Sequence, residues 1–133
     1  MNAGMVLFSY MGHTRQLGEV LQQELEEAVH TVDLIVLETQ EPLNLSADRT
    51  AIKPVPVVDN YDVLLLGSPV HGGRISAPMR AFLAENEGFG GKPCVLFVTH
   101  FLRRSWGAEQ TMTEFVDKCR EKGARILETC AVH

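Results

Sequence analysis

The sequence predicts an α/β protein with a doubly wound, five-stranded parallel sheet, and two observations support this prediction. Short apolar or β-branched segments alternate along the chain with longer segments whose apolar residues recur at helical spacing. The chain has 133 residues, of which 45% are hydrophobic and 22% are charged, as in a soluble globular protein of one domain, here residues 1–133. Strands that alternate with helices pair in parallel, because each helix returns the chain to the same end of the sheet.

The first half of the chain supplies two strands and one helix. Residues 4–9 are mostly apolar and predict a buried strand, and residues 14–29 predict a helix. The helix residues expected to face the sheet are Leu17, Val20, Leu21, Leu25 and Ala28. Residues 31–37 are β-branched and apolar, which predicts the second strand. Residues 38–58 are polar and contain three prolines, so we expect a long connection with room for a short helix over 46–52.

The second half supplies three strands and two helices. They are expected at 62–67 (strand), 76–85 (helix), 93–99 (strand), 108–122 (helix) and 125–132 (strand). The 62–67 strand is apolar on both sides, which is typical of a central strand in a parallel sheet. Pro78 suits the first turn of its helix, and Gly123 ends the following one. The helix residues expected to be buried are Met79, Phe82, Leu83, Met112, Phe115, Val116 and Cys119.

Composition argues against several classes of protein. The formal net charge of −5 disfavours nucleic acid as the main partner. Apolar segments are too short for membrane insertion, and no basic stretch before an apolar segment marks a signal peptide. Cys94, Cys119 and Cys130 are widely spaced, which favours reduced thiols in a cytoplasmic protein. The five histidines lack the spacing of metal ligands, so no metal site is expected.

Ligands of such sheets bind at the carboxyl ends of the strands, where three unusual loops are expected. The first, residues 9–14, combines the hydroxyls of Ser9 and Thr14 with Gly12 before the first turn of a helix. Unpaired N–H groups and the helix dipole favour an anion there, so the loop is either a phosphate site or an ordinary capped corner. Alone it favours neither.

The second loop, residues 67–77, and the third, residues 99–107, lie at the same edge. A central strand runs into Pro69, and Gly72 and Gly73 follow before a helix with proline in its first turn. The glycines would let the main chain approach a planar ring and change conformation. The alternative is a tight turn without a ligand, and we favour the functional interpretation.

With these segments in view, the chain resembles the flavodoxin-like family over nearly its whole length. In that family the first loop reads Ser/Thr-x-Thr-Gly-Asn-Thr and binds the phosphate of FMN, where this chain has Ser9-Tyr10-Met11-Gly12-His13-Thr14. The stretch before the second loop matches from Tyr61-Asp62 to Gly67-Ser68-Pro69. The following helix matches as Pro78-Met79-Arg80-Ala81-Phe82-Leu83. The resemblance implies strand order 2-1-3-4-5 and FMN as cofactor.

The resemblance also implies which residues contact FMN. They are Ser9, Tyr10, Met11, Gly12, His13 and Thr14 from the first loop, Ser68, Pro69, Val70, His71, Gly72, Gly73 and Arg74 from the second, and Thr99, His100, Phe101 and Trp106 from the third. Residues 70–74 would lie along the isoalloxazine edge, and the Gly72 carbonyl would turn towards flavin N5 on one-electron reduction. Trp106 and Phe101 are rival candidates for ring contact, and Tyr10 is expected at the rim.

The chain departs from the family pattern in three places. Met11 replaces a phosphate-binding threonine, and His13 replaces an asparagine but can still donate a hydrogen bond. Residues 99–106 lack the small, glycine-rich character of many third loops. The fifth helix of the family is missing after the last strand, so we expect a second copy of the chain to cover that sheet face, as a homodimer.

Charge is unevenly distributed around the three loops. Residues 8–18, 68–80 and 99–108 contain no Asp or Glu, yet they contain Arg15, Arg74, Arg80, Arg103 and Arg104 and three histidines. This predicts a basic surface around the cofactor, although some of the arginines, Arg15 and Arg80 above all, can point away. Arginines near the ring would raise the potential of the flavin or bind an anionic substrate such as a nicotinamide dinucleotide.

Three functions remain open, and they leave open whether the protein is an enzyme. The first is an FMN-binding electron-transfer protein that cycles FMN between oxidised, semiquinone and hydroquinone states and acts with redox partner proteins. The second is an FMN-dependent oxidoreductase that passes hydride from NAD(P)H to a quinone or similar small acceptor. The third is an interaction module without flavin. Family resemblance favours the first.

Overall fold

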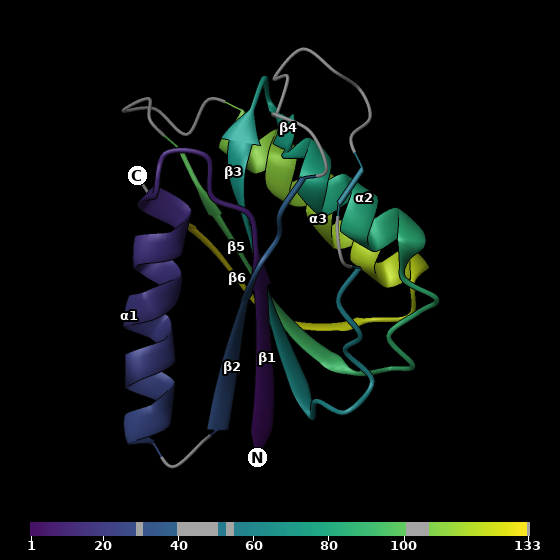
Figure 1. The fold of residues 1–133 in the computed structure, drawn as a ribbon. Helices are drawn as coiled ribbons and strands as arrows, with labels where there is room; N and C mark the ends of the chain where they lie inside the picture. Colours follow the sequence, from purple (N-terminus) through teal and green to yellow (C-terminus); the bar gives the residue numbers. More distant parts are fainter. Residues whose placement is uncertain (29–30, 40–50, 53–54, 101–106, 133) are drawn as a thin grey trace.

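The computed structural model describes residues 1–28, 31–39, 51–52, 55–100 and 107–132 (Figure 1). Its central feature is a parallel sheet of β1 (Asn2–Leu7), β2 (Thr31–Val36), β3 (Val63–His71), β5 (Pro93–Thr99) and β6 (Arg125–Val132) in the order β2-β1-β3-β5-β6. The short strand β4 (Arg74–Ile75) pairs antiparallel with β3 alone. Without β4, the order is the 2-1-3-4-5 that the resemblance implied, and β3 is central as predicted.

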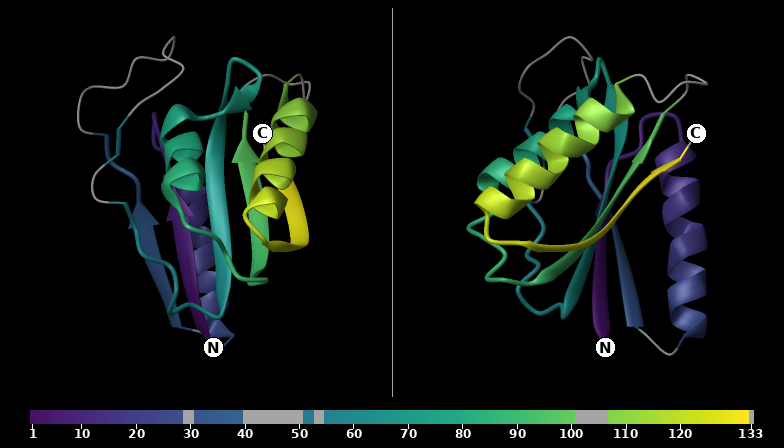
Figure 2. Two further views of the ribbon diagram at one scale, coloured as in Figure 1. Left: turned by 90° about the vertical axis from the view of Figure 1, so that its right-hand side faces the viewer. Right: turned by 180° about the vertical axis from the view of Figure 1, so that it is seen from behind.

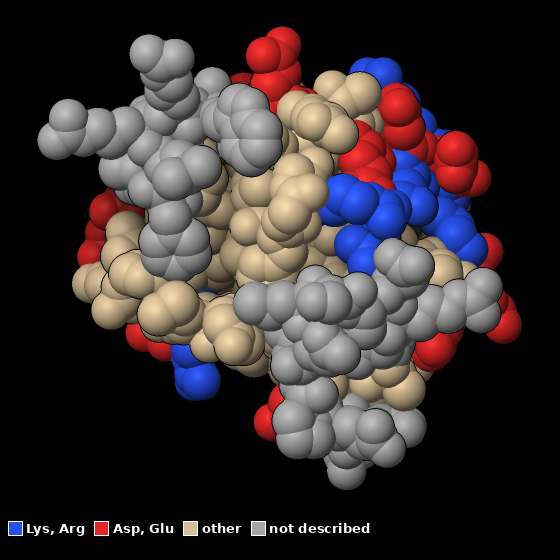
Figure 3. Space-filling model, turned by 90° about the horizontal axis from the view of Figure 1, so that it is seen from above, with Lys and Arg blue, Asp and Glu red and all other residues tan. Residues whose placement is uncertain are grey.

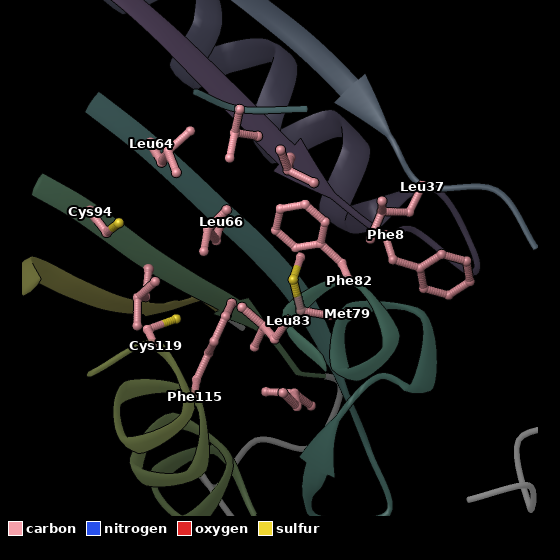
Figure 4. Close-up of a cluster of buried hydrophobic side chains, with 14 of the residues drawn as sticks. Phe8, Leu37, Leu64, Leu66, Met79, Phe82, Leu83, Cys94, Phe115 and Cys119 are labelled. Atoms are coloured by element: carbon pink, nitrogen blue, oxygen red, sulfur yellow. The ribbon is translucent and has the colours of Figure 1, made fainter. Parts of the chain in front are cut away.

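Helices cover both faces of the sheet. Helix α1 (His13–Glu27) packs on one face, and α2 (Ala77–Glu85) and α3 (Ala108–Glu121) pack on the other (Figures 1 and 2). Under α2 and α3, apolar side chains from both layers interlock, among them Leu64, Leu66, Met79, Phe82, Leu96, Phe115 and Cys119 (Figure 4). A second cluster under α1 contains Ala3, Met5, Leu7, Val32, Leu65 and Phe97. These clusters hold the strand ends in place.

The face of α1 that meets the sheet differs from the expected one. Leu17, Leu21 and Leu25 pack on the sheet as predicted, but Val20 is 56% exposed. The expectation for Val20 was wrong because α1 covers only part of this sheet face. The closest approach is made at Gly18, where a Cβ atom would overlap the Leu7 side chain. A glycine at this position therefore lets α1 lie close to β1.

The expected loop at 67–77 is largely a β-hairpin. Strand β3 does not end at residue 67 but continues to His71, and β4 returns beside it with Val70 opposite Ile75 and His71 opposite Arg74. The two residues between the strands, Gly72 and Gly73, have φ values of +60° and +77°. Positive φ at both central residues is the requirement of the type I′ turn, whose twist matches that of paired strands. The expected end of the strand at residue 67 was therefore wrong, and the Gly72–Gly73 pair forms the tight turn that was the alternative interpretation.

Strand β6 forms one edge of the sheet, and most of its residues are exposed. Among the described residues, α1 is the helix that packs on the face where the family's fifth helix was expected (Figure 2). The predicted homodimer at this face stays a prediction.

Of the helix expected at 46–52, residues 46–50 lie outside the described residues, and Ile52 forms a bridge with Thr39. No described helix is long and apolar enough to cross a membrane.

Candidate functional site

Segments from three parts of the chain meet at the carboxyl edge of the sheet. The hydroxyl of Thr14, in the first turn of α1, lies 2.8 Å from that of Thr99 at the end of β5. The ring of Tyr10, in the loop after β1, lies edge-on to His71 at 5.8 Å between centroids. The structure therefore brings the first predicted loop against both the hairpin and the end of β5.

The start of α1 has the backbone geometry of an anion site. Gly12 has φ +91° and ψ −10°, in the left-handed region, and the helix begins directly after it. A left-handed residue followed by right-handed ones directs successive N–H groups towards one point, an arrangement known as a nest. Gly12 has no side chain with which to cap this helix, and the first turn contains no acidic residue, but Ser9 Oγ accepts a hydrogen bond from the Arg15 N–H of that turn. A Cβ on Gly12 would meet no described atom within 4 Å, so the side of the turn towards which it would point is open among the described residues.

The hydroxyls of Ser9 and Thr14 in this loop already form hydrogen bonds within the protein. Ser9 Oγ accepts a hydrogen bond of 3.2 Å from the Arg15 N–H, and Thr14 is 2% exposed with its hydroxyl against Thr99. A hydroxyl has one donor and two acceptor positions, so Ser9 retains a donor for a ligand. The loop thus combines features of both interpretations, a capped corner and an open anion site.

Exposed side chains surround this nest. Tyr10 is 51% exposed and Met11 67% exposed, and His13 is exposed as well. Tyr10 lies at the rim, where it was expected. The half-buried His71 also packs edge-on to Phe8 at 6.3 Å between centroids. Burial, and secondly the charge of Arg80, lower the pKa of His71, which favours a neutral imidazole at neutral pH.

Hydrogen bonds close the base of the hairpin. Ser68 Oγ accepts from the Ser76 N–H at 2.9 Å and lies 3.0 Å from Ser76 Oγ. Ser76 in turn caps α2 by accepting from the Met79 N–H. Ser68 is fully buried and Pro69 is buried, so their side chains face the fold. At the tip, Gly72 is exposed, and a Cβ there would meet nothing within 4 Å.

The predicted basic surface is only partly present. Arg74 forms a 2.6 Å ion pair with Glu114 of α3, and Arg15 forms a 3.0 Å pair with Glu19. Arg80 donates to the Ile75 carbonyl at 2.7 Å. Figure 3, which views this edge of the sheet, shows Lys and Arg atoms gathered on one side with Asp and Glu atoms directly beside them, and an uncharged centre. The expectation did not include the two carboxylates that pair with these arginines, Glu114 of α3 and Glu19 in the second turn of α1.

A separate hollow of about 440 Å³ lies on the α1 side of the same edge. Its lining comes from α1 and from the ends of β5 and β6, namely His13, Gln16, Leu17, Val20, Thr99, His100 and Val132. Thr99 and His100 thus lie at the edge where the third loop was expected. Phe101, Arg103, Arg104 and Trp106 lie outside the described residues. Within the described part of the chain, no group of three or more His, Cys, Asp or Glu side chains could hold a metal ion.

Glu114 of α3 was missed by the sequence reasoning, and Gly107, directly before α3, lay in the expected third loop but was not among the expected FMN contacts. Glu114 binds the hairpin, and Gly107, with φ +80°, lies against its turn. A Cβ on Gly107 would lie 3.1 Å from Gly73 Cα, so the two glycines allow a close contact. The local sequence around Glu114 contains no signal of this role, because its partner is 40 residues away.

Comparison with known proteins identifies the fold. No family model matches the sequence, and no curated protein matches it. A flavoprotein in complex with FMN from Lactobacillus acidophilus NCFM superposes with a TM-score of 0.78 at 17% identity, over 98% of this chain and 92% of that chain.

Two flavodoxins are also similar. The two-electron reduced flavodoxin of Megasphaera elsdenii gives a TM-score of 0.72 at 21% identity, over 98% of this chain and 85% of its own. A flavodoxin from the domain Archaea gives 0.67 at 18% identity, over 100% of this chain and 84% of its own. The order of strands, the helices on both faces and these superpositions together show that the chain has the flavodoxin-like fold.

Proposed function

We propose that this chain, as one domain over residues 1–133, binds FMN at the carboxyl edge of its sheet and transfers electrons between redox partner proteins. The observation that carries the proposal is the left-handed turn at Gly12, which directs N–H groups at the start of α1 towards one point beside the Tyr10–His71 contact and the hairpin. An anion site beside apolar and aromatic surface suits a ligand with a phosphate at one end and a flat ring at the other. A solved structure with the same fold, the Lactobacillus acidophilus flavoprotein, is a complex with FMN.

The residues present fit this cofactor. The backbone N–H groups of the first turn of α1, apart from the Arg15 N–H that Ser9 accepts, would bind the phosphate, and the Ser9 hydroxyl would add a donor. Tyr10 and His71 would border the ring, and the exposed tip of the hairpin would place the Gly72 carbonyl near its edge. When bound, FMN supplies the capacity to accept and release one or two electrons.

Each of these residues has a defined task in that chemistry. A neutral His71 would place no positive charge beside the flavin ring. Tyr10 would limit the access of water to that ring. The Gly72 carbonyl, free of a side chain, would accept a hydrogen bond from the reduced flavin. Electron carriage is favoured over the NAD(P)H-dependent activity because Arg15 and Arg74, which would attract an anionic substrate, are paired with carboxylates.

The test is addition of FMN to the purified protein, followed by reductive titration. We expect binding at micromolar concentration, seen as quenching of flavin fluorescence, and a long-wavelength absorbance band at the one-electron stage. Turnover of NAD(P)H without this band would instead identify the oxidoreductase. Failure to bind FMN at micromolar concentration would contradict the proposal and leave the interaction module.

A further inference from the structure

The first half of β6 has features that hinder pairing with another chain, and the second half lacks them. Among the described residues no strand pairs with the outer side of β6, and residues 127–131 are exposed. Edge strands avoid pairing with other chains through charges and β-bulges. Arg125 carries a charge, and Leu127 is the extra residue of a bulge, where the strand bends (Figure 2). Residues 129–132 have no charge, no proline and no bulge, so this half of the edge is open to a further strand.

The backbone groups at the outer edge can be assigned from the bonds between β6 and β5. The Val132 carbonyl accepts from the His100 N–H at 3.0 Å, so the backbone groups of Val132 face β5. Successive residues of a strand direct their N–H and C=O groups to opposite sides. Cys130 therefore also faces β5, whereas the backbone groups of Thr129 and Ala131 point outwards, where no described strand lies beside them.

These outward groups determine how β6 can pair with β6 of a second copy about a two-fold axis. In an antiparallel pair, hydrogen bonds form only between opposed residues whose backbone groups face each other. Placing Thr129 opposite Ala131 of the second copy uses both residues in both chains, and each such pair makes two hydrogen bonds. Other registers within residues 129–132 use only one of the two residues. The favoured register is therefore centred on Cys130.

The side chains of β6 agree with this register. Val132 lines the hollow beside α1, and Cys130 is paired with Phe97 of the cluster under α1, so both side chains face α1. In this register Cys130 lies opposite Cys130 of the second copy, and Glu128 lies opposite Val132 of the second copy. The two Glu128 residues are then about 13 Å apart along the strands. A register centred on Glu128 would instead place two like charges side by side.

We propose that two copies of the chain pair through β6, antiparallel and centred on Cys130, and form one continuous sheet. The second copy is favoured over a peptide from another protein because β6 matches itself in its outward backbone groups and keeps its like charges apart. The carboxyl ends of the two β6 strands point in opposite directions, so the two candidate FMN sites open at opposite edges of the continuous sheet. The interface lies at the edge of the sheet, unlike the homodimer predicted at its face, and it does not depend on FMN.

The first test measures the mass of the protein by light scattering at several concentrations. We expect twice the mass of one chain for the wild type. Ala131→Pro removes an outward N–H but no bond to β5, so it should fold, as checked by circular dichroism, yet raise the Kd of the dimer at least about tenfold. Ala131→Ser keeps the N–H and is the matched control, which should remain a dimer. Thr129→Lys, which adds an edge charge without altering the backbone, should also weaken the dimer. A monomeric wild type, or equal dimerisation of all these proteins, would overturn the proposal.

The second test locates the two-fold axis through the Cys130 thiols. Opposed residues in a non-hydrogen-bonded pair have Cα atoms about 4.5 Å apart, a distance that a disulfide can span. Added diamide should therefore oxidise the two Cys130 thiols, which lose two electrons and two protons to diamide and form a disulfide between the copies. Cys94 and Cys119 are buried, which raises the pKa of both thiols, so neither should react.

The matched control is Glu128→Cys/Cys130→Ser, which moves the exposed thiol two residues along the same face of β6. In the proposed register these thiols belong to residues about 13 Å apart, beyond the reach of a disulfide, so cross-linking should be at least about tenfold slower than in the wild type. Equal rates would indicate random collision or another register and would overturn the proposal. A dimer that dissociates in Val20→Glu but not in Ala131→Pro would use the face of the sheet, which would overturn it as well.

Discussion

The hydroxyl pair of Thr14 and Thr99 allows a quantitative test of how the first loop is held at the sheet. Their Oγ1 atoms lie 2.8 Å apart, and Thr14 is 2% exposed. Thr14→Val removes one hydroxyl at nearly constant volume and leaves Thr99 without this partner. An unpaired buried hydroxyl costs about 1–3 kcal/mol. Because Thr99 is only half-buried and its hydroxyl can turn towards water, we expect a loss of about 1 kcal/mol in the free energy of unfolding.

The assay is a double-mutant cycle followed by urea denaturation. Removing both hydroxyls leaves no unpaired group, so the Thr14→Val/Thr99→Val protein should lose less than the sum of the single variants, with a coupling of about 1 kcal/mol. Thr113→Val is the control, because this exposed hydroxyl donates to the Glu109 carbonyl of its own helix at 3.1 Å, and its removal should change stability by less than about 0.5 kcal/mol. Strict additivity of the single variants would refute the interaction.

The same variants test the phosphate site independently of stability. Thr14→Ser retains the hydroxyl and should bind FMN almost as the wild-type chain does. Thr14→Val should bind about tenfold more weakly if the hydroxyl also contacts the phosphate, which corresponds to about 1.4 kcal/mol. Equal affinities in all three proteins would place the phosphate away from Thr14.

Three further outcomes are expected. Gly67→Ala should destabilise the fold by about 1–3 kcal/mol in urea denaturation, because a Cβ there would overlap the buried Phe97 ring. The lowered pKa of His71 means that its unfolded form binds a proton more readily than its folded form, so the contribution of His71 to stability should be lost as pH falls below about 6.5, and His71→Asn should remove that dependence in unfolding at pH 5 and pH 8. If a homodimer covers the hollow beside α1, Val20→Glu should reduce the mass measured by light scattering, whereas Val57→Glu, at another exposed site, should not.

Each of these three has a clear contrary result. A Gly67→Ala protein as stable as the wild type would mean that Phe97 moves aside without cost. An acid-induced loss of stability that persists in His71→Asn would assign it to other groups. A monomeric wild-type chain would make the homodimer expectation wrong.

Much of the fold was predictable because its signals are local. Leu17, Leu21 and Leu25 recur at the helical period, and the 62–67 segment is apolar on both sides, so each element could be assigned from its own residues. The hairpin was not predictable in this way, because the Gly72-Gly73 pair suits both a loop without strand pairing and a type I′ turn. Which one forms depends on the pairing of Val70 with Ile75, which lies outside any local pattern.

The candidate site shows the same division. Gly12 was singled out because a glycine lets the backbone approach a ligand closely, and its left-handed conformation is one that favours glycine. The exposure of Val20 was not predictable, because the burial of this side chain depends on which segments distant in the sequence cover that face of the sheet. The basic surface was overestimated because counting charges within segments cannot register partners from other segments.

Patterns along the chain were sufficient to predict the class of fold, the order of its elements and the three segments expected at the carboxyl edge of the sheet. Periodicity and turn residues act over a few positions, and the topology of parallel strands then places the loops together. The contacts that hold those segments are visible in the folded structure alone, since Thr14 meets Thr99 and Arg74 meets Glu114 across large separations in the chain. Hydrogen bonds and ion pairs form between groups that folding brings within about 3 Å, and no local pattern encodes that proximity.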